Sequence, residues 1–316
     1  MIITPASVQG LFTQYDTRFS AAYAKFGTEP WYSKIAMEMP SRTAQTLYAW
    51  LAHLPAMREW LGARQIQNLE TLSYQIINRK WELTLGLQRT VLEDDQYDTY
   101  GPWMDQAAYQ ARKWPDQQIW PLLASGNTAT YGTCYDGQNF FSTSHPVDPL
   151  NSALGTQSNL YSGGYGLTWD NYAKVRASMM ALVRNDGKNP LGVVPNLLVV
   201  PPQLEPLARL IVESKTIAAN TLSGQTMVGG QDNWAFGTAK VLMIPELAGS
   251  PTSWFLMDTR QPILPLIWQL RVAPEFTYRN QLTDEHVFSA DEFLYGIRAR
   301  AAPGYGIWFL AAMATP

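Results

Sequence analysis

Residues 70–87, ETLSYQIINRKWELTLGL, place the strongest constraint on how this chain folds. Apolar and polar side chains alternate there, and a period of two is typical of a strand with one buried face. The alternating positions are Tyr74, Ile76, Trp81, Leu83, Leu85 and Leu87. Residues 35–39 and 46–51 also read as extended, so the sequence predicts a long β-hairpin over about residues 36–90.

The middle of this predicted hairpin is strongly apolar. It contains Trp50, Leu54, Met57, Trp60 and Leu61 in a short span. Full burial of one large apolar side chain is worth roughly 1.5 to 3 kcal/mol, so this cluster needs a partner surface. Deleting the segment would unfold an ordinary core but would spare a subunit whose partner lies on another molecule.

Composition points to a covered surface. Hydrophobic residues make up 46% of the chain and charged residues only 16%, against about 25% charged in an average soluble protein. The chain also has 12 Trp and 16 Tyr, which are favoured in contacts between subunits. An aromatic-rich enzyme core is the alternative explanation.

The charge balance argues against a basic nucleic-acid footprint, since the formal net charge is −3 and the pI about 5.7. A protein shell can still enclose DNA without binding it tightly. The single cysteine, Cys134, cannot form an internal disulfide. No stretch approaches about 18 consecutive apolar residues, and residues 1–9 lack the features of a signal peptide. We therefore expect a soluble chain that assembles in a bacterial cytoplasm without a membrane partner.

Two helices are predicted in the first half. Apolar residues recur at three and four over residues 7–26, with Ser7 as N-cap and Gly27 as stop. A second helix, preceded by the carboxylates of residues 93–95, runs to about Leu123 with a bend or restart at Pro115. Its expected buried face comprises Trp103, Ala107, Ala111 and Trp114.

The second half predicts a compact α/β lobe. Residues 128–166 read as loops and short hairpins, and 223–237 as a glycine-rich loop. The predicted elements are a helix capped by Thr168 and reaching Val183, a helix at residues 203–213, and strands at residues 197–200, 240–244, 254–257 and 267–272. A closing hairpin is predicted from residues 292–300, a turn at 302–304, and residues 306–312.

Catalytic chemistry finds little support. His53, His145 and His286 show no metal-ligand spacing, so we expect no metal and no cofactor. The best enzymatic candidate is a cysteine hydrolase that uses Cys134 and His145, because an imidazole can activate a thiolate. A lone cysteine is far more often a small apolar filler.

Several strings together resemble the major head subunits of Mu-like phages. They are Ile2-Ile3-Thr4-Pro5-Ala6 with Leu11-Phe12, Arg58-Glu59-Trp60 with Gly62, Leu92-Glu93-Asp94-Asp95 with Tyr100-Gly101-Pro102, residues 135–141 (YDGQNFF) with Ser144-His145-Pro146, residues 295–300 (YGIRAR), and Gly304-Tyr305-Gly306. They span nearly the whole chain in the right order, and this order makes the resemblance specific.

The resemblance implies the Hong Kong 97-like α+β capsid fold. Its parts would be an N-terminal arm at 1–35, an extended E-loop hairpin at 36–90, a peripheral domain with a spine helix at 91–164, an axial domain at 165–270, and a return to the peripheral sheet at 271–316. In such a protein the apolar hairpin tip, Trp50, Leu54, Met57, Trp60 and Leu61, would contact an adjacent subunit.

The resemblance also implies a function. The chain would be the major capsid protein of a tailed bacteriophage, assembling as hexamers and pentamers into an icosahedral virion shell. The shell would enclose double-stranded DNA without sequence-specific binding. Because the chain starts at the arm itself, a separate scaffold protein is expected, with a portal and a decoration protein as further partners. An encapsulin-like cargo shell and the Cys134–His145 hydrolase are the alternatives.

Overall fold

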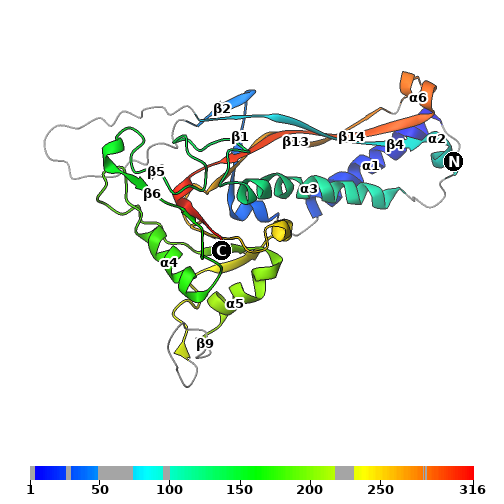
Figure 1. The fold of residues 1–316 in the computed structure, drawn as a ribbon. Helices are drawn as coiled ribbons and strands as arrows, with labels where there is room; N and C mark the ends of the chain where they lie inside the picture. Colours follow the sequence, from blue (N-terminus) through cyan, green and yellow to red (C-terminus); the bar gives the residue numbers. More distant parts are fainter. Residues whose placement is uncertain are drawn as a thin grey trace.

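The computed structural model describes residues 4–25, 30–48, 74–94, 100–217, 231–279, 281 and 283–316. These residues form an α+β fold built on two sheets (Figure 1). The long sheet has the strand order β1-β13-β14-β4, and the second sheet has the order β11-β8-β12-β15-β7. No helix among the described residues is long and apolar enough to cross a membrane.

The long sheet is an extended ribbon. Its central strands β13 (Leu266–Arg279) and β14 (Glu292–Tyr305) are antiparallel and 14 residues long. At one edge β1 (Ala36–Pro40) runs parallel to β13, and at the other β4 (Arg79–Gln88) runs antiparallel to β14. Alternate residues of β14, including Phe293, Tyr295 and Ile297, are buried, so one face of the ribbon is covered.

The helices α1 (Pro5–Lys25) and α3 (Gly101–Ala124) lie along one face of this ribbon (Figure 1). Phe12 of α1 stacks on Tyr295 with ring centroids 4.4 Å apart. Arg18 of α1 forms a 2.7 Å ion pair with Asp105 of α3. The short helices α2 (Arg89–Asp94) and α6 (Glu285–Ala290) lie at the far end of the ribbon (Figure 1).

The second sheet is the core of a separate lobe. Its strands β8 (Leu197–Val200), β12 (Trp254–Met257) and β15 (Ala311–Ala314) are buried throughout. The outer strands are β11 (Lys240–Met243) and β7 (Leu160–Tyr161). The predictions for residues 197–200 and 254–257 are confirmed, because short apolar runs without alternation are typical of strands buried on both faces.

Helices flank this lobe. In α4 (Trp169–Met180) the Thr168 side chain accepts a hydrogen bond from the Asn171 amide, which confirms the predicted cap. The helix ends at Met180 rather than Val183. α5 (Glu205–Glu213) follows a short turn of 3₁₀ helix, η4 (Pro202–Leu204).

The remaining elements are short. They are β2 (Gln45–Leu47), β3 (Gln75–Ile77), β5 (His145–Pro146), β6 (Thr156–Gln157), β9 (Thr216–Ile217), β10 (Gln231–Asp232), η1 (Trp31–Lys34), η3 (Ser152–Leu154), η6 (Pro245–Gly249) and η7 (Trp308–Leu310). The region between α3 and α4 is loop with the β5–β6 hairpin, as predicted.

The prediction of one long hairpin over residues 36–90 is confirmed for the inner strands β2 and β3, which pair antiparallel, and is wrong for the flanking strands. Within the described residues only β2 and β3 pair with each other, from Gln45 opposite Ile77 to Leu47 opposite Gln75. The flanking strands β1 and β4 lie at opposite edges of the long sheet, where each pairs with a strand from the C-terminal part of the chain. Alternation predicts a strand but not its partner.

The predicted closing hairpin is also wrong. β14 continues through Ala302, Pro303 and Gly304 to Tyr305 without a turn. β15 then joins the second sheet, antiparallel to β12. The last strands of the chain therefore connect the two sheets.

Three details of the helices differ from the predictions. Thr4, not Ser7, is the N-cap of α1, because its Oγ1 accepts from the Ser7 amide at 3.1 Å. α3 is a single helix through Pro115, so no restart occurs there. Its buried face contains Met104, while Trp103 is 61% exposed.

Candidate functional site

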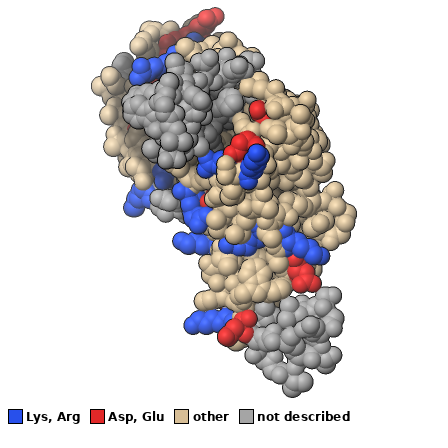
Figure 2. All heavy atoms as spheres, turned by 90° about the vertical axis from the view of Figure 1, so that its left-hand side faces the viewer, with Lys and Arg blue, Asp and Glu red and all other residues tan. Residues whose placement is uncertain are grey.

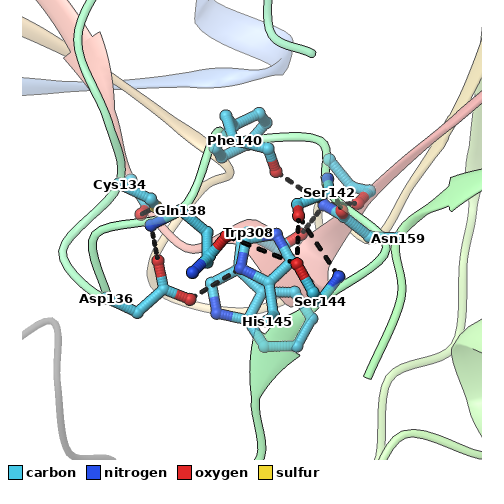
Figure 3. Close-up of polar contacts among 11 residues, drawn as sticks. Cys134, Asp136, Gln138, Phe140, Ser142, Ser144, His145, Asn159 and Trp308 are labelled. Carbon is cyan, nitrogen blue, oxygen red and sulfur yellow. Dashed lines mark hydrogen bonds and ion pairs between the residues drawn. The ribbon is translucent and has the colours of Figure 1, made fainter. Parts of the chain in front are cut away.

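The predicted nucleophile Cys134 lies in a buried loop (Figure 3). Its Sγ donates to the Gly306 carbonyl at 3.7 Å. Burial raises the pKa of the Cys134 thiol well above its usual range, and the neighbouring Asp136 carboxylate raises it further. A thiol with a raised pKa stays protonated near neutral pH, so it is a poor nucleophile.

His145 is engaged elsewhere. Its Nδ1 lies 2.6 Å from Oδ2 of Asp136, and its ring stacks on Trp308 with centroids 4.0 Å apart (Figure 3). The side chains of His145 and Asp136 are both fully buried. The buried His145–Asp136 pair connects the loop to η7 through the Trp308 ring. Because neither side chain is exposed, the pair cannot contact a substrate.

Asn159 completes this buried cluster. Its Nδ2 donates to the carbonyls of Phe140 (2.8 Å), Trp308 (3.1 Å) and Ala311 (3.0 Å), and its Oδ1 accepts from the Ser142 amide at 2.8 Å. One side chain thereby satisfies backbone groups of three segments. Sequence reasoning missed Asn159, because a polar residue in a loop rich in Ser and Asn carries no signal of burial.

No group of His, Cys, Asp or Glu within the described ranges could hold a metal ion. His286 lies on α6, and its Nε2 is 3.2 Å from Oε2 of Glu292. His53 and Asp95 lie outside the described residues. Asp94 ends α2 and is exposed.

The predicted intersubunit residues lie outside the described part of the chain. These are Trp50, Leu54, Met57, Trp60 and Leu61. The structure places only the base of their segment, where β2 and β3 pair beside the long sheet.

The face of the long sheet opposite α1 and α3 carries a hollow that sequence reasoning missed. It has a volume of about 420 Å³ and is lined by Lys80, Trp81, Glu82, Arg298, Ala299 and Arg300. The signal was present in Arg298-Ala299-Arg300, because cations two apart on a strand point to one face. Elsewhere charge is sparse, and most of the described surface in Figure 2 belongs to uncharged residues.

Comparison with known proteins gives a family match over most of the chain. The model described as "Mu-like prophage major head subunit gpT" matches residues 8–170, 164–247 and 235–315. The major capsid protein of Escherichia phage Mu is 29% identical over 311 residues, which cover 98% of this chain and 74% of that protein.

Solved structures of phage capsids also match this chain. A chain in the procapsid of bacteriophage JBD30 matches with a TM-score of 0.60 and 29% identity, covering 99% of this chain and 76% of that one. A chain in the JBD30 capsid decorated with minor capsid protein trimers matches with a TM-score of 0.52 and 27% identity, covering 78% of this chain and 99% of that one.

Proposed function

This chain belongs to the Mu-like prophage major head subunit family, and from that premise we propose how its parts are used in a capsid. It is a major capsid protein of a Mu-like tailed phage, a structural component of the head shell and not an enzyme. The observation that carries this assignment is a family match that extends along nearly the whole chain. The Cys134–His145 hydrolase is thereby rejected.

The division of the chain into capsid subdomains is part of the proposal. The long sheet with α3 would be the peripheral domain, with α3 as its spine helix and α1 as the N-terminal arm. The lobe around the second sheet would be the axial domain. We therefore propose other boundaries than the sequence-based ranges, 165–270 for the axial domain and 271–316 for the return to the peripheral sheet. β7 and β15 belong to the second sheet, and β13 belongs to the long one.

The shell of identical subunits would enclose double-stranded DNA without sequence-specific contacts, with hexamers and pentamers as its building units. A net charge of −3 supports a wall that does not condense DNA. A scaffold protein, a portal and a decoration protein would be the further partners. Nuclease-resistant DNA inside purified particles would support this proposal, and particles with protein cargo and no genome would support the encapsulin-like alternative.

The apolar segment around Trp60 would be the E-loop tip that binds an adjacent subunit. We predict that replacing residues 50–72 with a short Gly-Ser turn leaves a cooperatively melting monomer that no longer forms shells. The cut begins after Tyr48 because this residue is 1% exposed and donates from its hydroxyl to Gln269 at 2.8 Å. Calorimetry and sedimentation would measure the two effects.

A matched substitution separates assembly from folding. Trp60→Ala would weaken assembly strongly and change the melting temperature little, whereas Trp254→Ala, at a fully buried position of β12, would mainly lower the melting temperature. A shortened chain that unfolds, or one that still builds normal particles, would show that the intersubunit contact lies elsewhere.

A further inference from the structure

A buried amide side chain lies in the long sheet among apolar residues. Gln269 of β13 is fully buried, and the residue before it, Trp268, packs its ring against Trp114 of α3 with centroids 4.9 Å apart. Because successive side chains of a strand point to opposite faces, Gln269 points away from α3. A buried amide group is costly unless its hydrogen bonds are formed, so its partners indicate what the residue does.

The partners of Gln269 belong to the inner hairpin, β2–β3, and to its ends. Its Oε1 accepts from the Tyr48 hydroxyl at 2.8 Å, and its Nε2 donates to the Ile76 carbonyl at 3.1 Å and to Oδ1 of Asn78 at 2.8 Å. Tyr48 directly follows β2, Ile76 lies in β3, and Asn78 directly follows β3. One side chain thus ties both strands of the hairpin to the long sheet.

Further contacts hold the hairpin on the same face. The Tyr305 amide of β14 donates to the Tyr74 hydroxyl at 2.8 Å. The Ile76 side chain lies so close to Gly304 that a Cβ there would overlap it. Tyr48 and Ile76 are both buried. The base of the hairpin is therefore packed against the sheet as well as hydrogen-bonded to it.

Asn78 extends the network to the chain on both sides of the hairpin. Its Nδ2 donates to Oγ of Ser41 and to the Thr43 carbonyl, each at 2.9 Å, and its backbone amide donates to the Ala44 carbonyl at 3.0 Å. Since Nδ2 is used in this way, Oδ1 is the atom that faces Gln269, and the orientation of both amide groups is fixed. The segment that enters β2 is therefore joined to the segment that leaves β3.

This network fixes a direction. β2 and β3 have three residues each, and a two-stranded hairpin is marginally stable in water on its own. An apolar side chain at position 269 could fill a core, but it would not discriminate between nearby placements of the hairpin. A satisfied buried polar network does so, because a shift of the hairpin would leave several buried groups without partners. The chain therefore leaves Tyr48 and returns at Tyr74 in a set direction.

We propose that Gln269 is a positioning residue for assembly. By holding β2 and β3 on the long sheet, it presents residues 49–73 to the neighbouring subunit in a preset direction. Binding then does not bear the entropic cost of orienting the base of the hairpin. This role rests on the proposed function, in which the apolar segment around Trp60 binds an adjacent subunit.

Gln269→Met tests the proposal, because methionine has a similar length and cannot form the three hydrogen bonds of Gln269. The subunit concentration at which shells first form, with the proposed scaffold protein present, should rise about tenfold or more. In the free subunit the amides of Tyr48 and Asn78 donate to the Tyr74 and Ala44 carbonyls. Their hydrogen exchange should become about tenfold faster or more.

Asn159→Leu is the matched control. Asn159 is also buried and its amide group also forms several hydrogen bonds, but to other parts of the chain. This variant should lower the melting temperature and yet, at a temperature where it is folded, change the assembly threshold less than about twofold. Tyr48→Phe is a milder variant that removes one hydroxyl. It should raise the threshold about threefold, and should add little to Gln269→Met because both act on one network.

Two results would overturn the positioning role. One is a Gln269→Met chain that assembles at the wild-type threshold or whose Tyr48 and Asn78 amides exchange as slowly as before. The other is an Asn159→Leu chain whose threshold rises as much. The chain with residues 50–72 replaced separates this failure from that of the proposed function. If that chain still built shells, the proposed contact itself would fail; if it built none while Gln269→Met behaved as the wild type, only the positioning role would fail.

Discussion

A fully buried histidine beside a fully buried carboxylate is costly unless each satisfies the other. In this capsid protein Asp136 and His145 share a 2.6 Å hydrogen bond, and the stacked Trp308 ring closes the site. In the sequence, Cys134 and His145 offered only the enzymatic alternative. The structure instead gives the two residues different neighbours, because Cys134 bonds to Gly306.

His145 and Cys134 should therefore differ in their effect on stability. We expect His145→Ala to lower the free energy of unfolding by about 3 to 5 kcal/mol, since it leaves Asp136 buried without its partner. Cys134→Ser should cost about 1 to 3 kcal/mol. Denaturant unfolding of the subunit measures both. His145→Ala chains as stable as the wild type that formed normal but non-infectious particles would indicate a chemical role.

A second buried carboxylate lies where α3 meets η1 and η6. Oδ1 of Asp116 accepts from the Tyr32 amide at 2.9 Å, and nearby Lys113 is 3.7 Å from Glu246. Burial, with a smaller contribution from Glu246, raises the pKa of Asp116 to about 6, although the backbone hydrogen bond from Tyr32 opposes the shift. The folded chain thus holds this proton more tightly than the unfolded one.

This shift predicts a pH dependence with a definite sign. Between about pH 4 and pH 6 the folded state retains the Asp116 proton while the unfolded state loses it, so the contribution of Asp116 to stability falls as pH rises. Asp116→Asn keeps an acceptor for the Tyr32 amide and cannot ionise. The difference in unfolding free energy between variant and wild type should therefore grow across this window, by roughly 3 kcal/mol at most. A constant difference would contradict the assignment.

At the scale of elements, local signals predicted best. The Thr168 cap and the apolar runs of β8 and β12 depend only on neighbouring residues in the sequence, and these elements lie where they were predicted. The turn predicted at Pro303-Gly304 is wrong, because proline and glycine are common in turns but also occur at the edges of sheets. Pro303 pairs with Trp268 of β13 beyond the point where β4 ends, so its missing N–H disrupts no ladder to a further strand.

Glycines after Pro303 are needed for close packing. A Cβ on Gly306 would lie 2.7 Å from the Pro265 carbonyl oxygen, which is backbone and cannot turn aside, whereas one on Gly304 would meet the flexible side chain of Ile76. We expect Gly306→Ala to cost more stability than Gly304→Ala, each in the range of about 1 to 3 kcal/mol or more.

Gly10 in α1 is the matched control, because nothing lies within 4 Å of its added Cβ. Gly10→Ala should stabilise the helix by about 0.5 to 1 kcal/mol. Thermal melting of the three variants tests the order. A Gly306→Ala chain as stable as the wild type would show that the backbone there can shift.

At the scale of the whole molecule, sequence patterns could not supply the pairing of distant strands. β1 pairs with β13 from Ala36 opposite Leu266, a juxtaposition that no local pattern encodes. Low charge and abundant aromatic residues indicated contacts between subunits. The Arg298-Ala299-Arg300 pattern placed two cations on one face, but only the alignment of β4 with β14 shows that Lys80 lies opposite Arg300.

Among the described residues no helix covers the second face of the long ribbon, and Phe288 at its end is exposed, a shape suited to binding neighbours. Many moderate contacts per subunit can sum to a closed shell while each remains weak enough to be corrected during assembly.

Electron microscopy of the purified protein, produced together with the scaffold protein proposed above, tests the central claim most directly. We predict closed shells of uniform size that sediment far ahead of the free subunit. A sample that contained only monomers and dimers under these conditions would contradict the account.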